Sequence, residues 1–124
     1  MPHERSRKRN AGPWAEDLAC RRLLQSGLTL LARNYRCGSG ELDLVLRDSG
    51  AVVFVEVRFR GRGDYGTSAE SVDLRKQRRL VRTARHYLHR HPHENRTSVR
   101  FDVVLVDGEP ARPTIEWIRN AFQA

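Results

Sequence analysis

Two carboxylates, Asp43 and Glu56, interrupt the most apolar part of this sequence. Each lies in a segment of alternating apolar residues typical of a half-buried β-strand, and the turn-forming residues 48–50 separate the segments 41–47 and 52–58. These segments are predicted to form an antiparallel hairpin. One register places leucines opposite valines on a single side of the sheet, as a hydrophobic core would select. In that register Leu42, Leu44 and Leu46 face Val57, Val55 and Val53.

On the other side of the sheet, the same register puts Asp43 directly across from Glu56. Carboxylates at such positions, with Cβ atoms about 5 Å apart, repel each other and destabilise a hairpin. A protein tolerates the pair when a cation lies between them or when one carboxyl stays protonated. Mg²⁺ (or Mn²⁺) suits this position, because Mg²⁺ uses one or two protein carboxylates together with water and phosphate oxygens. Arg58 follows Glu56 by two residues and is expected to point at the same ligand.

A metal ion, a guanidinium and a phosphate together describe metal-assisted hydrolysis of a phosphodiester. The alternative leaves Asp43 and Glu56 on a solvated face, paired with arginines. The register and the Glu-x-Arg triplet favour the site over this alternative.

The composition favours a nucleic-acid partner. The chain has 124 residues, with 23 Lys and Arg against 15 Asp and Glu, and its formal net charge is +8. All of these basic residues except Lys8 and Lys76 are arginine, whose planar fork matches phosphate, although genome base composition could also produce this excess. With 39% hydrophobic residues and no long apolar run, a soluble domain without a membrane span is expected. The segment 1–12 lacks the apolar region of a secretory signal, so the expected compartment is the cytoplasm.

The hairpin must be positioned by the rest of one α/β (α+β) domain. Residues 1–12 are predicted to be a disordered basic arm, and residues 13–124 a single domain. Its predicted order is α-β-β-β-α-β-β, with a short final strand. The helices are expected from Pro13 to Gly27 and over 73–89, and the strands over 28–36, 41–47, 52–58, 99–107 and 114–118.

The second predicted helix and the loop before it carry most of the candidate nucleic-acid contacts. The helix is strongly basic, so it either follows a phosphate backbone or forms an ordinary solvated face, and the sequence favours neither. Gln77 is a candidate to orient a water or a phosphate, with a hydrogen bond to nearby backbone as the favoured alternative. The residues predicted to contact nucleic acid are Arg60, Arg62, Arg75, Lys76, Arg79 and Arg82.

Other titratable residues give weaker signals. The four histidines between 86 and 93 lack zinc-ligand spacing, so solvated loop histidines are favoured over a zinc site. Asp102 is either a further acid near the metal or a strand residue paired with an arginine. Cys20 and Cys37 are expected to be reduced thiols.

The motifs resemble those of the YraN-like family of uncharacterised bacterial proteins. This family consists of predicted endonucleases of the restriction-endonuclease-like (PD-(D/E)xK) superfamily, related to Holliday junction resolvases. The sequence GELD at 40–43 resembles the family's G-E-x-D motif, and FVEVR at 54–58 resembles F-V-E-V-K. The resemblance covers roughly residues 12–122. Further matches are Ala15-Glu16, Ala19, Asn34-Tyr35-Arg36, Tyr65-Gly66, Lys76-Gln77, Arg79-Leu80 and Arg100-Phe101-Asp102-Val103.

This resemblance implies a restriction-endonuclease-like core, a mixed β-sheet flanked by helices. It makes Asp43 and Glu56 the metal-binding carboxylates, with the carbonyl of Val57 as a further ligand and Glu16 approaching from the first helix. Arg58 stands where the superfamily has a catalytic lysine, and an arginine stays protonated and cannot easily act as a base. Two functions remain open: a Mg²⁺-dependent endonuclease acting on DNA, or a catalytically weak or inactive nucleic-acid-binding module. A domain this small covers little of a duplex, which makes a homodimer compatible with either function.

Overall fold

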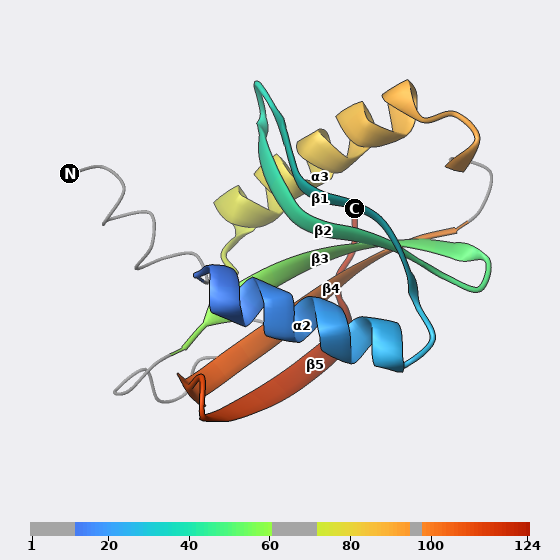
Figure 1. Ribbon diagram of the computed structural model, residues 1–124. Helices are drawn as coiled ribbons and strands as arrows, with labels where there is room; N and C mark the ends of the chain where they lie inside the picture. Colours follow the sequence, from blue (N-terminus) through green and yellow to red (C-terminus); the bar gives the residue numbers. More distant parts are fainter. Residues whose placement is uncertain (1–11, 61–71, 95–97) are drawn as a thin grey trace.

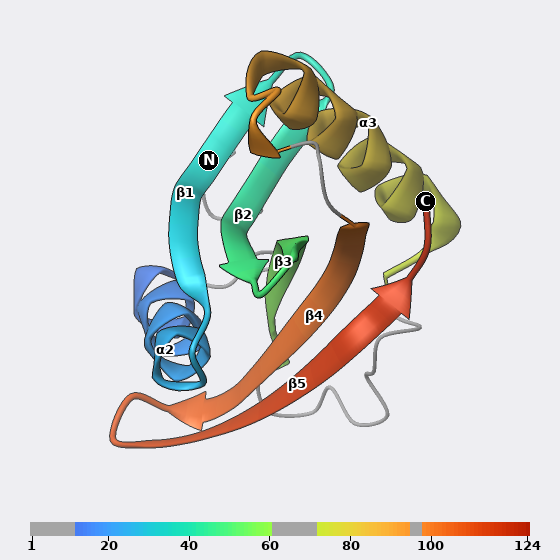
Figure 2. The ribbon, with the colours of Figure 1, turned by 90° about the vertical axis from the view of Figure 1, so that its right-hand side faces the viewer.

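In a computed structural model of the chain, the structure describes residues 12–60, 72–94 and 98–124 (Figure 1). Within these ranges two helices pack on opposite faces of a five-stranded sheet, as Figure 2 shows. The predicted order of elements and the α+β class are confirmed, while the predicted arm lies outside the described residues. The elements are α2 (Pro13–Gln25), β1 (Thr29–Cys37), β2 (Gly40–Asp48), β3 (Ala51–Phe59), α3 (Leu74–Arg90), β4 (Ser98–Glu109) and β5 (Arg112–Phe122).

The sheet is mixed, and its strands follow one another in chain order. Strands β3 and β4 are parallel, because α3 crosses one face of the sheet between them, and the other neighbouring strands are antiparallel. The predicted hairpin register is confirmed where β2 and β3 pair, since Leu44 lies opposite Val55 and Leu46 opposite Val53. The central strand β3 therefore has partners on both edges.

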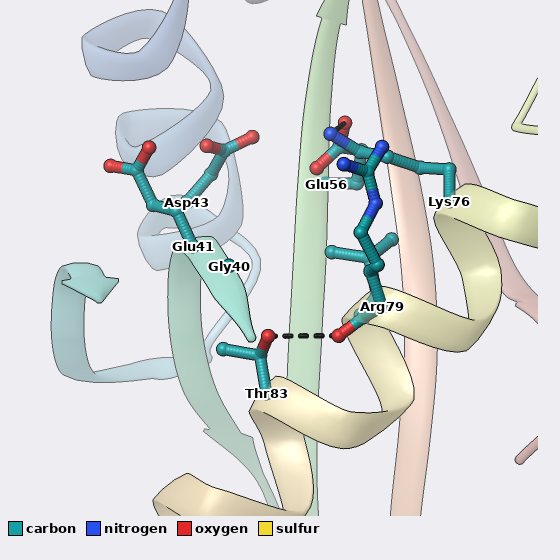
Figure 3. Close-up of a pocket in the computed structure, with 8 residues that line it drawn as sticks. Gly40, Glu41, Asp43, Glu56, Lys76, Arg79 and Thr83 are labelled. Carbon is teal, nitrogen blue, oxygen red and sulfur yellow. Dashed lines mark hydrogen bonds and ion pairs between the residues drawn. The ribbon is translucent and has the colours of Figure 1, made fainter. Parts of the chain in front are cut away.

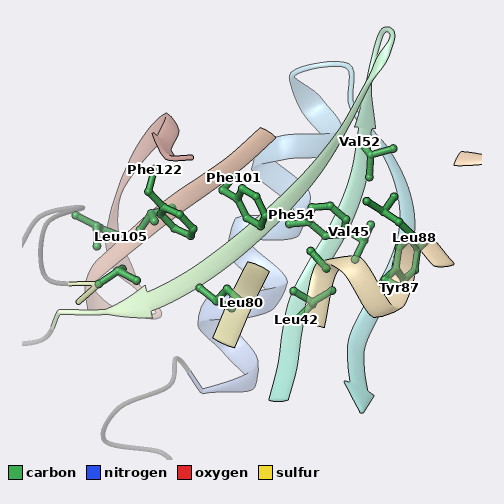
Figure 4. Packing of buried hydrophobic residues seen from close by; sticks show 13 residues of the cluster. Leu42, Val45, Val52, Phe54, Leu80, Tyr87, Leu88, Phe101, Leu105 and Phe122 are labelled. Carbon is green, nitrogen blue, oxygen red and sulfur yellow. The ribbon is translucent and has the colours of Figure 1, made fainter. Parts of the chain in front are cut away.

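Side chains of β3 alternate between two hydrophobic cores. Val53, Val55 and Val57 pack in the core under α2, while Val52 and Phe54 pack in the core under α3 (Figure 4). Because helices cover both faces, the strand is apolar at nearly every position instead of alternating with polar residues. Glu56 and Arg58 are the exceptions within β3, and Glu56 lies on the α3 side of the sheet.

The prediction for Leu42 is wrong. It was expected on the same side as Leu44 and Leu46, but it packs in the α3-side core. The paired register of β2 and β3 ends at Leu44 and Val55, and beyond it the β1–β2 turn rises beside α3 (Figure 1). Strict alternation of side chains between the two faces fails here because the pairing of β2 with β3 ends. Asp43 is the first residue of β2 outside that pairing.

The final strand was also predicted incorrectly. It was expected to be short, over 114–118, but β5 runs from Arg112 to Phe122 and pairs with β4 along its length. Its burial alternates between exposed and intermediate, so its hydrophobic pattern is weak. The β4–β5 turn requires Gly108, whose φ is +83° and whose Cβ would collide with the Arg112 carbonyl. None of the helices in the described ranges has the length and apolar character needed to cross a membrane.

Candidate functional site

Asp43 occupies the point where the β2–β3 ladder ends. Its side chain is 6% exposed, and its Oδ2 accepts a hydrogen bond from the Val57 backbone N–H at 2.8 Å. The Asp43 carboxylate thus accepts the hydrogen bond of a β3 N–H group that lies beyond the last backbone pair of β2 and β3. The N–H and C=O of one strand residue point to the same side, so the Val57 carbonyl also faces the Asp43 side. Asp43 is therefore next to a main-chain oxygen as well as to a second carboxyl group.

Glu56 is that second carboxyl group. It is 5% exposed, and its Oε2 lies 3.4 Å from the Nζ of Lys76, which reaches across from α3 (Figure 3). Both carboxylates and Lys76 line one cavity of about 180 Å³ between α3 and the strands. The cavity therefore joins the predicted acidic pair to a basic residue of α3. The described lining residues are Gly40, Glu41, Asp43, Glu56, Lys76, Arg79, Leu80 and Thr83.

Burial raises the pKa of both acids. The pKa of Asp43 lies well above its ordinary value, chiefly because of burial and then because of the charge on Glu56. Burial likewise raises the pKa of Glu56, although Lys76 and, less strongly, Arg58 oppose this rise. Both shifts favour the protonated form of these carboxyls more than in ordinary acids, and one protonated carboxyl is one of the two arrangements that make facing carboxylates tolerable.

The cavity rim is formed by a close approach between the β1–β2 turn and α3. Gly40 has a φ of +148°, and a Cβ built on it would lie 3.2 Å from Thr83 Oγ1. Thr83 is fully buried and donates its hydroxyl hydrogen bond to the Arg79 carbonyl at 2.8 Å. Gly40 therefore lets the turn close against the helix beside Asp43.

The start of α3 fixes the backbone of Lys76. Asp73 is the N-cap residue, and its carboxylate accepts the Lys76 backbone N–H at 2.8 Å, an interaction that lowers the pKa of Asp73. The Lys76 side chain points the other way, toward Glu56 (Figure 3). The cap thus holds the helical residue that delivers an ammonium group to the cavity.

Three residues predicted to be catalytic lie outside this lining. The described residues that line the cavity do not include Glu16, Arg58 or Gln77. Glu16 accepts a hydrogen bond from Asn34 at 3.1 Å, and its charge makes a minor contribution to the raised pKa of Asp43. The Gln77 amide donates to the Val72 carbonyl at 2.7 Å, which is the backbone interaction favoured from the sequence.

The predicted nucleic-acid contacts fall into two groups. Arg79 lines the cavity, and Arg75 and Arg82 are exposed on α3. Arg60 instead forms ion pairs with the β4–β5 hairpin, at 3.0 Å to Asp107 and 3.8 Å to Glu116. Arg62 lies outside the described residues.

Sequence reasoning placed Lys76 among the phosphate contacts and missed its place beside Glu56. A signal was present, because Lys76 is the single lysine between residues 12 and 124, where every other basic position is arginine. A lysine retained in such a chain indicates a position where the two cations are not interchangeable.

Asp102 is separate from the site. It pairs in register with Val55, whose side chain faces α2, so it lies on the opposite face of the sheet from Glu56. Its carboxylate accepts from Arg100 at 2.9 and 3.0 Å, and from Trp117 Nε1 and the Asn120 N–H at 2.9 Å each. Of the two alternatives predicted for Asp102, the structure shows the strand residue paired with an arginine, Arg100.

Two of the four histidines, His86 and His91, make aromatic contacts, whereas His89 and His93 are exposed. His86 lies in α3, and its Nδ1 is 2.5 Å from the Tyr35 hydroxyl oxygen. His91 stacks on Tyr87, with ring centroids 4.1 Å apart. Among the described residues no three His, Cys, Asp or Glu side chains are grouped so that they could hold a metal ion.

The chain is similar over most of its length to one group of bacterial proteins. The model of the uncharacterised protein family UPF0102 matches residues 15–106. A UPF0102 protein of Nitrosomonas europaea is 51% identical over 113 residues, which cover 91% of this chain and 93% of the relative. A UPF0102 protein of Stutzerimonas stutzeri is 45% identical over 119 residues, which cover 96% of this chain and 99% of the relative.

Proposed function

Because the chain belongs to the uncharacterised protein family UPF0102, its function must be argued from the site, and we propose a divalent-metal-dependent nuclease that hydrolyses DNA phosphodiester bonds. One observation carries the proposal. Two buried carboxylates, Asp43 and Glu56, share a cavity with Lys76 and Arg79 in a chain whose net charge is +8. Buried acids in a strongly basic chain are explained when a cation between them binds the phosphate that the surrounding charge attracts.

The donor set fits Mg²⁺ or Mn²⁺. Asp43, Glu56 and the Val57 carbonyl would supply the oxygen ligands, and the rest of the coordination sphere would be water and substrate phosphate. Mg²⁺ keeps several waters and uses one or two carboxylates, so it does not need a complete protein cage. The raised pKa values of both acids support this fit, because a divalent cation stabilises the ionised forms that burial and repulsion disfavour.

In the proposed reaction a water oxygen bonds to phosphorus as the bond from phosphorus to one sugar oxygen breaks. A proton passes from the water through solvent to the departing sugar oxygen, so the phosphodiester becomes a phosphomonoester and an alcohol. When bound, the metal ion supplies Lewis-acid polarisation of the phosphate and activation of the water. Asp43 and Glu56 hold that ion, and Arg58 and Arg79 add fixed positive charge near the phosphate.

The nucleic-acid strand is proposed to run from the cavity along α3. Arg75, Arg79 and Arg82 are spaced i, i+4 and i+7, so they share one face of the helix, and they span about 10 Å along its axis. The middle residue of this stripe, Arg79, lines the cavity, so the stripe passes beside the cavity. Successive phosphates of one strand would therefore meet successive arginines.

Replacing Arg82 with glutamine tests this path. The variant is expected to bind DNA a few-fold more weakly and to reduce the slope of log K against log salt by about 1. The matched control is Arg22→Gln, which removes an exposed arginine from α2 on the opposite face. Fluorescence anisotropy over a series of KCl concentrations measures both, and equal losses in the two variants would indicate general attraction by net charge instead of a path along α3.

The direct test of the nuclease is cleavage of single-stranded, duplex, flapped and branched DNA with Mg²⁺ or Mn²⁺. The parent chain is expected to cleave at least one of these substrates, and Glu56→Gln, purified in parallel, is expected to cleave none. Equal traces of cleavage in both preparations would indicate contamination and contradict the proposal.

A second candidate function is a non-catalytic nucleic-acid-binding module, favoured by the arginine at position 58. Calorimetric titration with Mn²⁺, with and without DNA, separates the two functions. Metal uptake that depends on Asp43 supports the nuclease, whereas salt-sensitive DNA binding without such uptake supports the module.

A further inference from the structure

We propose that Lys76 of α3 is the catalytic cation of this site, a role that rests on the proposed nuclease function and goes beyond the binding of a DNA strand. Its ammonium group is inferred to leave Glu56 when substrate enters and to donate hydrogen bonds to a non-bridging oxygen of the scissile phosphate. The residue would then touch the atoms on which negative charge develops.

The position of Lys76 is the first argument. Its Nζ lies 3.4 Å from Glu56 Oε2, and its side chain lines the cavity that also holds Asp43. The side chain is 30% exposed, whereas Glu56 is almost fully buried, so Lys76 is the more accessible of the two charged groups. A phosphate that approaches the two carboxylates meets this group.

The second argument is the choice of side chain. Arginine occupies every other basic position from residue 12 onward, including Arg79 one turn along on the same rim. Lysine presents a compact charge with three rotatable donors on a flexible stem, while arginine presents a rigid planar fork. A cation that pairs with Glu56 in the free protein and then turns to a phosphate needs the flexible stem and rotatable donors of lysine.

The third argument concerns Arg58, the other cation near the pair. Arg58 acts on Glu56 through its charge but is not among the described residues that line the cavity. Among the described residues, Lys76 is the cation that forms an ion pair with Glu56, at 3.4 Å. The helix, and not the strand, therefore delivers the cation closest to the acids.

Two charge-conserving exchanges test the proposal. Lys76→Arg should slow single-turnover cleavage by about a hundredfold, while its affinity for DNA stays within about twofold of the parent. The mirror-image control Arg22→Lys should keep cleavage within about threefold of the parent, because Arg22 is exposed on α2, on the opposite face of the sheet from the cavity. Circular dichroism and the melting temperature verify folding, and Lys76→Gln provides a second variant that should also lose cleavage while it still takes up Mn²⁺.

The outcomes distinguish this proposal from the one on which it rests. Cleavage by Lys76→Arg or Lys76→Gln at the parent rate, with Glu56→Gln inactive, would overturn the role of Lys76 and leave the nuclease standing. Equal slowing in Lys76→Arg and Arg22→Lys would likewise overturn it, because the effect would then not depend on the position beside Glu56. A parent chain that cleaves none of the substrates overturns both proposals.

Discussion

The Asp43→Asn variant is expected to lose metal-dependent DNA cleavage by about a thousandfold or more and to melt at a higher temperature than the metal-free parent near pH 8. The loss of cleavage follows because an amide lacks the negative charge that holds the cation beside Glu56. The gain in stability follows because asparagine is nearly the same size as the buried acid but carries no charge. Its amide oxygen can still accept the hydrogen bond from the Val57 N–H.

The pH dependence of stability gives the sign of this effect. The raised pKa of Asp43 means that the folded chain holds its proton more tightly than the unfolded chain does. The resulting stabilisation is complete below the pKa of the unfolded chain and is lost as the pH rises through the higher pKa of the folded chain. In EDTA the melting temperature of the parent should therefore fall as the pH rises from the unfolded to the folded pKa of Asp43. The melting temperature of Asp43→Asn should fall less over the same pH range.

The matched control is Glu116→Gln, which neutralises an acid whose side chain is 57% exposed on β5. This variant should cleave DNA at the parent rate and should keep the parent's dependence of melting temperature on pH. The account of Asp43 is wrong if Asp43→Asn cleaves at the parent rate, or if its melting temperature falls with pH as steeply as that of the parent.

The Asp102→Ala variant is expected to lose about 3–5 kcal/mol of unfolding free energy. Asp102 is fully buried, and its removal leaves Arg100, Trp117 Nε1 and the Asn120 N–H without this acceptor. Breaking a buried charge pair from one side is costly because the remaining charge stays desolvated. Urea unfolding monitored by tryptophan fluorescence measures the loss.

The control for this variant is Asp48→Ala, which removes the other acid paired with Arg100, at 3.1 Å. Asp48 is 30% exposed, so its removal should cost only about 1 kcal/mol or less. A loss for Asp102→Ala no larger than the loss for Asp48→Ala would contradict the account of this network. Two buried aspartates thus have opposite expected effects on stability, because one is fully paired and the other faces a second acid.

The hairpin and its acidic pair could be predicted because both depend on local alternation. Leu44 and Val55 had to share a face to bury their side chains, and this requirement fixes the positions of Asp43 and Glu56 nearby. The same reasoning failed for Leu42, because the alternation rule assumes a continuous ladder. The departure of β2 is a tertiary feature, in which the β1–β2 turn closes on α3 at Gly40.

The role of α3 could be predicted only in part. Its amphipathic pattern correctly assigned a buried face and a basic face, but it does not say which strand lies opposite each turn of the helix. The contact of Lys76 with Glu56 depends on the crossover from β3 to β4, which brings the start of α3 over the end of the hairpin. For Gln77 the favoured prediction, a hydrogen bond to nearby backbone, is confirmed, because its amide donates to the carbonyl of Val72, five residues earlier in the chain.

The most direct test of the central claim is a crystal structure of the parent chain grown or soaked with Mn²⁺, analysed by anomalous difference density. The account predicts a peak between Asp43 and Glu56, at about 2.1 Å from a carboxylate oxygen of each and within reach of the Val57 carbonyl. The peak should be absent from Asp43→Asn crystals treated in the same way. Well-ordered density for both carboxylates with no peak between them, at Mn²⁺ concentrations that support cleavage, would contradict the claim that these two acids form the metal site.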